Sequence, residues 1–177
     1  MTIGHSTLPV ERFIGALREN GCDLLVDVRT VPRSRHNPQF AQENLTGSLD
    51  AAGIGYKWAK ELGGLRRARK DSINTAWKNA SFRGYADYMQ TEEFAAAVEE
   101  LMASPRIGRL CVMCAEAVPW RCHRSLIGDA VIARGHVVED IFVAANGTSH
   151  RKRHSMTKFA RMEGSRVWYP GEDSLFA

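Results

Sequence analysis

The stretch MCAEAVPWRCHRS, residues 113–125, contains two of the four cysteines of the chain together with a glutamate, a histidine and two arginines. Thiols and imidazoles are the side chains that serve as nucleophiles, proton carriers and metal ligands near neutral pH. Three chemistries fit this stretch: a reactive thiol, a metal site and a phosphate-binding helix entrance. A polar helix entrance with no chemistry is the structural alternative.

A reactive thiol is the first of these chemistries. We expect Cys122 in the first turn of a helix that begins at CHRS, where unpaired backbone N–H groups and the helix dipole favour an anion. Arg121, His123 and Arg124 add positive charge around it, and such surroundings lower the pKa of a thiol. His123 would then be a partner for proton transfer.

Cys114 ends a predicted strand, from which it could present a second reactive sulfur; a small core residue is the alternative. Glu116 follows it and could act as general acid or base, or orient an arginine. Cys114 followed by Arg121 also resembles the cysteine-to-arginine loop of thiol phosphatases. Here the two residues lie one position further apart than in those enzymes, with a proline between them, which argues against a phosphatase.

A metal site would start from Cys111 and Cys114, whose spacing is common among zinc ligands. Side chains alternate along a strand, however, so these two should point to opposite faces. We therefore expect Cys111, like Cys22, to be a buried packing residue. The ligands that remain are Cys114, Cys122, His123 and His5. They lack a standard spacing, so we assign no metal and keep a metal-binding protein as an alternative.

Polar side chains also follow the other predicted strands. TIGH ends in His5, and LLVDVR contains Asp27 and Arg29, with Arg33 in the loop beyond. The carboxyl ends of parallel strands meet at one edge of a sheet, where open α/β folds bind their ligands. Each residue has a structural alternative: an interior histidine, a carboxylate paired with an arginine, or a solvated loop. Their convergence with residues 113–125 favours a functional site.

The elements that must position these residues alternate between strands and helices. Short apolar runs predict strands at residues 2–5, 23–29, 54–59, 109–115 and 136–142. Helical patterns cover residues 8–21, 82–89, 91–104 and 122–135, and a further helix ends near residues 50–53. This order predicts an α/β domain with a mostly parallel sheet of about five strands and helices on both faces.

Length and composition suit a single globular protein of 177 residues with a net charge of +4. We expect an α/β core over residues 1–143 and a basic extension over residues 144–177 that packs on the same domain. The aromatic and apolar residues expected to anchor the extension are Phe159, Val167, Trp168 and Tyr169. No signal peptide or membrane span is expected, and four cysteines are too few for a disulfide scaffold, so reduced thiols in the cytoplasm are expected.

Two basic segments suggest an anionic partner. LGGLRRARK, residues 62–70, contains Arg66, a candidate substrate ligand, and SHRKRH occupies residues 149–154. Aromatic residues near the first segment would suit nucleic acid, although a solvated surface is the alternative. The glycines of the first segment permit either a close approach to a ligand or a simple turn.

The motifs form an ordered series that resembles the family known as domain of unknown function 488. The series comprises TIGHST, LVDVR with PRSR and NPQF, LGGLR, FRGYADYM, MCAE, CHR, MTKFAR and VWYP. The resemblance implies an α/β fold with a Rossmann-like three-layer core. It also implies that the family's motifs include His5, Asp27, Arg29, Arg33, Glu116, Cys122, His123 and Arg124. It implies no reaction.

Our leading hypothesis is a small cytoplasmic enzyme that acts on an anionic substrate, for which we expect a phosphate-bearing nucleotide or nucleic acid. The candidate catalytic residues are His5, Asp27, Cys114, Glu116, Cys122 and His123. The candidate substrate-binding residues are Arg29, Arg33, Arg66 and Arg124. Two alternatives stay open: a non-catalytic nucleic-acid-binding module, and a metal-binding protein that uses Cys114, Cys122 and His123. The sequence specifies no cofactor and no oligomeric state.

Overall fold

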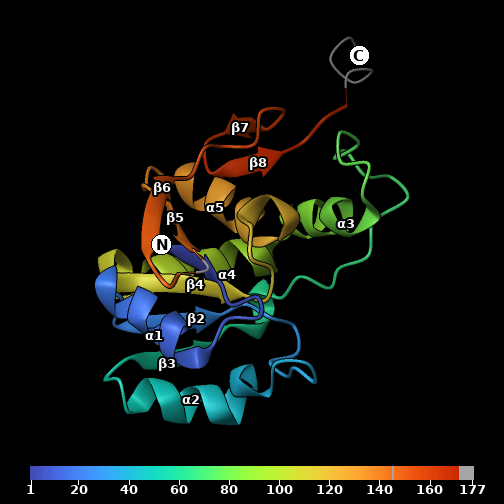
Figure 1. Ribbon diagram of the computed structural model, residues 1–177. Helices are drawn as coiled ribbons and strands as arrows, with labels where there is room; N and C mark the ends of the chain where they lie inside the picture. The colour runs from blue at the N-terminus through green and yellow to red at the C-terminus, as the bar shows by residue number, and fades with distance from the viewer. Residues whose placement is uncertain (145, 172–177) are drawn as a thin grey trace.

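The centre of the fold is a six-stranded sheet in the order β3-β2-β4-β1-β5-β6 (Figure 1). The computed structural model describes residues 1–144 and 146–171. The sheet strands are β1 (Thr2–Gly4), β2 (Leu24–Asp27), β3 (Gly55–Trp58), β4 (Leu110–Cys114), β5 (Glu139–Val143) and β6 (Ser149–Arg153). β1 to β5 are parallel and β6 is antiparallel to β5, which confirms the predicted mostly parallel sheet.

Helices cover both faces of the sheet, as Figure 1 shows, and make the fold three-layered. They are α1 (Val10–Glu19), α2 (Gln42–Asp50), α3 (Ala80–Tyr88), α4 (Glu92–Met102) and α5 (Arg124–Ile132). Phe13 of α1 and Leu45 of α2 are buried on one face, whereas Phe94 of α4 and Leu126 of α5 are buried on the other. α1, α2 and α4 each bury one apolar stripe against the sheet, whereas α5 is buried along almost its whole length.

Strand β4 shows how the pleat separates the cysteines. Val112 and Cys114 belong to the core under α4 and α5, whereas Cys111 and Met113 belong to the core under α1 and α2. Side chains three positions apart in a strand point to opposite faces, so the predicted separation of Cys111 and Cys114 is confirmed. Cys22 is buried in the same layer as Cys111, as predicted.

One sequence prediction about local structure was wrong, and one strand was not predicted. Cys122 is not in the first turn of a helix: it lies between a short 3₁₀ helix (Pro119–Arg121) and α5, which begins at Arg124. The segment SHRKRH contains the strand β6, which we did not predict. An edge strand is held by backbone hydrogen bonds to one neighbour, so its charged side chains can remain exposed and no apolar alternation is required.

The chain beyond β5 returns to the core. The hairpin of β7 (Arg161–Glu163) and β8 (Arg166–Trp168) places Val167 in the core under α4 and α5, next to the buried Tyr169. Tyr169 donates a hydrogen bond of 2.8 Å to Asp129 of α5. Residues 145 and 172–177 of the expected extension lie outside the described residues. None of the described helices has the length and apolar character needed to cross a membrane.

A buried histidine joins this returning segment to the core. His154 Nδ1 lies 2.7 Å from Asp140 Oδ2, and its Nε2 lies 3.5 Å from Asp129 Oδ1. Burial alone would lower the pKa of His154, but hydrogen bonding and charge from Asp129 and Asp140 outweigh burial and raise it to about 9. The imidazole is therefore held in its charged form between two carboxylates.

We expect this cluster to make stability depend on pH. Because the pKa of His154 rises from 6.5 to about 9 on folding, its contribution is fully present below pH 6.5 and is lost as the pH rises through about 9. The free energy of unfolding should therefore fall across this window. Urea unfolding at several pH values should show a much smaller fall for His154→Gln. Parallel pH profiles for the two proteins would contradict the prediction.

Candidate functional site

A cavity of about 740 Å³ opens at the carboxyl ends of β1, β2 and β4. The predicted site residues that line it are His5, Arg29, Arg33, Cys114, Glu116, Cys122 and His123. Three predicted residues do not line it, namely Asp27, Arg66 and Arg124. The strand ends thus bring together segments that are distant in the sequence, as expected for an open parallel sheet.

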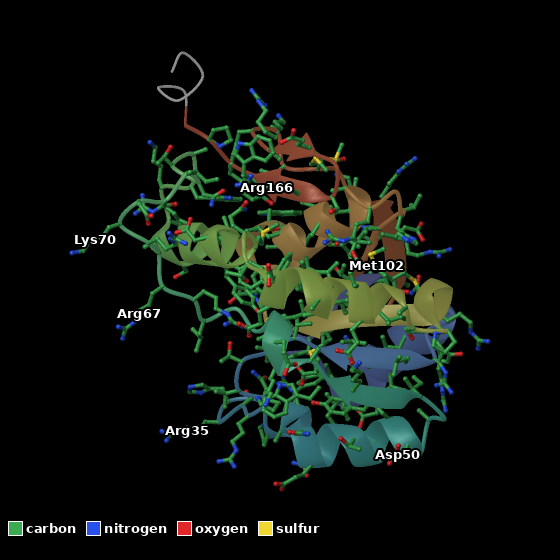
Figure 2. The ribbon with its side chains drawn as sticks, turned by 180° about the vertical axis from the view of Figure 1, so that it is seen from behind. Arg35, Asp50, Arg67, Lys70, Met102 and Arg166 are labelled. Carbon is green, nitrogen blue, oxygen red and sulfur yellow. The ribbon has the colours of Figure 1, made fainter. Side chains whose placement is uncertain are left out.

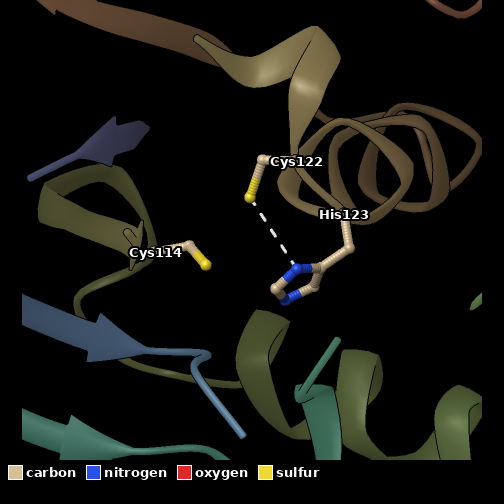
Figure 3. Close-up of side chains that lie close together, drawn as sticks. All are labelled: Cys114, Cys122 and His123. Atoms are coloured by element: carbon tan, nitrogen blue, oxygen red, sulfur yellow. Dashed lines mark hydrogen bonds between the residues drawn. The ribbon is translucent and has the colours of Figure 1, made fainter. Parts of the chain in front are cut away.

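Cys114, Cys122 and His123 form a compact cluster on the cavity wall. Their sulfur atoms and a ring nitrogen of His123 all lie within 4.8 Å of one another. Figure 3 shows the two thiols and the imidazole turned toward a common centre, Cys114 from the end of β4 and the other two from the short segment just before α5. The distance from Cys122 Sγ to His123 Nδ1 is 3.7 Å.

A backbone carbonyl determines which ring nitrogen of His123 can accept a hydrogen bond from the thiol. Nε2 lies 3.0 Å from the carbonyl oxygen of Val28. A carbonyl only accepts hydrogen bonds, so Nε2 must carry the hydrogen. In the neutral ring, Nδ1 then has a free lone pair directed at Cys122. The sequence offered no signal for this contact, because a backbone carbonyl is present at every position.

Gly64 allows the imidazole to pack in this orientation. A Cβ atom built on Gly64 would lie 2.5 Å from Nδ1 of His123. On the other side, the ring centroid of Tyr85 lies 4.9 Å from that of His123. The sequence left two interpretations of the glycine pair open, a close approach to a ligand or a simple turn. Gly64 does make a close approach, but to a site residue of the chain itself.

The two thiols differ in their affinity for a proton. A hydrogen bond from Cys114 lowers the pKa of Cys122, and His123 and Arg124 lower it further despite burial. The same hydrogen bond, together with burial, raises the pKa of Cys114 well above the ordinary value. The arrangement therefore favours a thiolate on Cys122 that is stabilised by the thiol of Cys114.

Arg124 is buried and acts inside the protein. Its NH1 group donates a 3.0 Å hydrogen bond to Thr2 Oγ1, and its NH2 group donates a 2.7 Å hydrogen bond to the carbonyl of Glu116. Among the described residues, no carboxylate lies within ion-pair distance of Arg124. It therefore connects β1 with the loop after β4, and its charge acts on Cys122 from inside the core.

Asp27 and Arg29 bind each other. Arg29 donates hydrogen bonds from Nε to Asp27 Oδ1 at 2.9 Å and from NH2 to Oδ2 at 2.6 Å. Tyr56 also donates a hydrogen bond to Oδ2, at 2.8 Å. A carboxylate saturated in this way holds the guanidinium in place. Tyr56 was missed at the sequence level, since it appeared only as part of an ordinary strand.

His5 forms a neutral wall of the cavity. Its ring stacks on Phe40 with centroids 4.2 Å apart, and its Nδ1 donates to the Ser6 carbonyl at 2.8 Å. Nε2 consequently accepts, and Arg29 NH1 lies 3.4 Å from it. Burial lowers the pKa of His5 to about 4. His123, not His5, is therefore the histidine that faces a thiol.

The remaining predicted residues divide into two groups. Arg66 lies over the Tyr88 ring, 3.5 Å from its centroid, and donates to the carbonyls of Gly63 and Glu61. Arg33 and Glu116 are exposed at the cavity. A further exposed lining residue, Arg121, was not among the predicted substrate-binding residues; the sequence suggested it as a source of charge for Cys122 and as part of a phosphatase-like loop that its spacing does not fit.

Together, the fold and the site define a three-layer α/β protein with a thiol–imidazole cluster at the carboxyl edge of its parallel sheet. The model of the family described as "Domain of unknown function DUF488" matches residues 9–131, more than half of the chain. The chain therefore belongs to this family, which confirms the resemblance seen in the sequence motifs. No curated protein and no solved structure matches it.

Proposed function

We propose that this protein is an enzyme that uses the Cys122 thiolate as a nucleophile. The observation that carries the proposal is the hydrogen bond between His123 Nε2 and the Val28 carbonyl, which directs Nδ1 at the Cys122 sulfur. A thiol beside an oriented imidazole is the usual form of an activated cysteine nucleophile. Nδ1 receives the proton that leaves Cys122 and returns it to the leaving group.

The substrate of this enzyme is anionic in our proposal. Arg33 and Arg121 are exposed at the cavity and form no ion pair within the described part of the chain. Their charges are therefore free to bind a phosphate or a carboxylate. Glu116, exposed on the same wall, would act as a second acid or base. We place the enzyme in the reducing cytoplasm, which suits its four free thiols.

Alkylation by iodoacetamide, followed over pH with mass-spectrometric site assignment, tests the proposal. We expect Cys122 to react well below the reference thiol pKa of about 8.5, because its thiolate is stabilised. His123→Ala and Cys114→Ser should each shift the Cys122 profile to higher pH. Cys111, buried on the other face of the sheet, is the internal control. Ordinary Cys122 titration in metal-free protein would refute the proposal.

A zinc-binding function is the second candidate. Two cysteines and a histidine are a known catalytic zinc set, with the fourth position left for water or substrate. A metal-bound histidine usually donates its other ring N–H to a carbonyl or carboxylate, as His123 Nε2 does to Val28. Elemental analysis of protein purified without chelators tests this function. About one zinc per chain in the wild type and its loss in Cys114→Ser would favour it over the free thiolate.

A further inference from the structure

The edge of the molecule around the cavity is rich in unpaired positive charge. We call this set of exposed side chains the basic edge: Arg33, Arg35, Arg67, Lys70 and Arg121. Figure 2 shows three of them, Arg35, Arg67 and Lys70, projecting from the same side of the molecule. None of the five forms an ion pair with another described residue.

Two residues of the basic edge line the cavity, and two more lie close in sequence to lining residues. Arg33 and Arg121 line the cavity. In the sequence, Arg35 lies two residues from Arg33, and Arg67 lies two residues from Leu65, which also lines the cavity. Asp71, the acidic residue next to Lys70 in the sequence, is already paired with Arg69 at 2.7 Å. The positive charge is therefore spread over three chain segments, which is more than one isolated phosphate would require.

Apolar side chains accompany these charges. Leu65 is 78% exposed and Val31 is 57% exposed, and both line the cavity with Phe82. Beside Arg121, the indole of Trp120 is 64% exposed. Unpaired bases pack on aromatic and apolar surfaces while their phosphates bind arginine and lysine. This combination distinguishes the basic edge from a merely solvated charged face.

From this arrangement we propose that the basic edge binds single-stranded nucleic acid and leads one nucleotide into the cavity. The inference rests on the proposed function and names the class of its substrate. A volume of about 740 Å³ admits a nucleotide-sized group. Cys122 is buried in the cavity wall, and a base within a duplex cannot reach such a recessed group without leaving its stack.

The strand β6 provides a matched control. Its Lys152 and Arg153 are also exposed, but Arg153 lies opposite Glu139 in the register of β6 and β5, at the amino edge of the parallel strands. Arg106, also exposed, precedes β4 at that same edge. Removal of three charges there changes the net charge by the same amount as removal of three from the basic edge.

Fluorescence anisotropy with a labelled oligodeoxythymidylate of about ten nucleotides tests the inference. We expect wild-type affinity to fall steeply with salt. In the triple variant Arg35→Gln, Arg67→Gln, Lys70→Gln, the slope of log affinity against log salt should decrease in magnitude by about 2, or roughly 0.7 for each contact removed. The control Arg106→Gln, Lys152→Gln, Arg153→Gln should retain most of the wild-type slope.

Several results would overturn the inference. The first is an equal salt slope for the two triple variants. The second is binding of a duplex or a mononucleotide that is as tight as binding of the single-stranded oligonucleotide, or tighter. The third is binding of anionic lipid vesicles in place of the oligonucleotide. The pH profile of Cys122 alkylation is measured on the same protein preparations. Loss of binding with normal Cys122 reactivity would thus reject the nucleic-acid substrate alone, whereas binding by a protein with an unreactive Cys122 would reject the thiol mechanism alone.

Discussion

Replacement of Gly4 by alanine is expected to lower the free energy of unfolding by about 3 kcal/mol or more. Gly4 pairs with Cys114 at the carboxyl ends of β1 and β4. A Cβ atom there would overlap the backbone carbonyl of Glu116 and would lie 2.8 Å from Arg124 NH2. Backbone cannot yield as a flexible side chain can, so the loop after β4 would have to move.

A second glycine supplies the control for this experiment. A Cβ atom at Gly15 in α1 would meet no atom within 4 Å. Gly15→Ala should therefore raise the free energy of unfolding by about 0.5–1 kcal/mol, because alanine is favoured in helices. Urea unfolding followed by circular dichroism measures both variants. Equal stability of the two would show that β1 and the loop do not require their close approach.

Asp27→Ala is expected to cost about 3–5 kcal/mol of stability, since it leaves the buried guanidinium of Arg29 without its partner. Arg29 would retain its 2.9 Å hydrogen bond to the Phe40 carbonyl but lose its ionic partner. Tyr56 would lose its acceptor as well. Asp50→Ala, at the exposed end of α2, should change stability by less than about 0.5 kcal/mol.

A second substitution of Asp27, to asparagine, separates positioning from catalysis. Asp27 was a candidate catalytic residue, yet it lies outside the cavity lining and is saturated by Arg29 and Tyr56. In Asp27→Asn, which keeps the size of the side chain, the alkylation profile of Cys122 should stay close to that of the wild type. A profile shifted to higher pH would return Asp27 to the catalytic group.

The sequence by itself determined the parallel part of the sheet and the place of the candidate site. Alternating apolar runs and helical patterns specified parallel strands. Two parallel strands must be joined by a crossover connection, which is usually an α-helix. The position of polar residues just after those strands then located His5, Cys114 and Glu116 at the cavity, since parallel strands end at a common edge. The pleat alone separated Cys111 from Cys114.

Only the tertiary structure decided which of these polar groups are free to act. Residue type does not reveal whether an arginine faces a carboxylate, a carbonyl or solvent, because those partners come from distant segments. Arg29 is taken up by Asp27 and Arg124 by the Glu116 carbonyl, whereas Arg33 remains exposed at the cavity. The Val28 carbonyl likewise orients His123 through a contact across the sheet edge, a contact that exists only after the chain has packed.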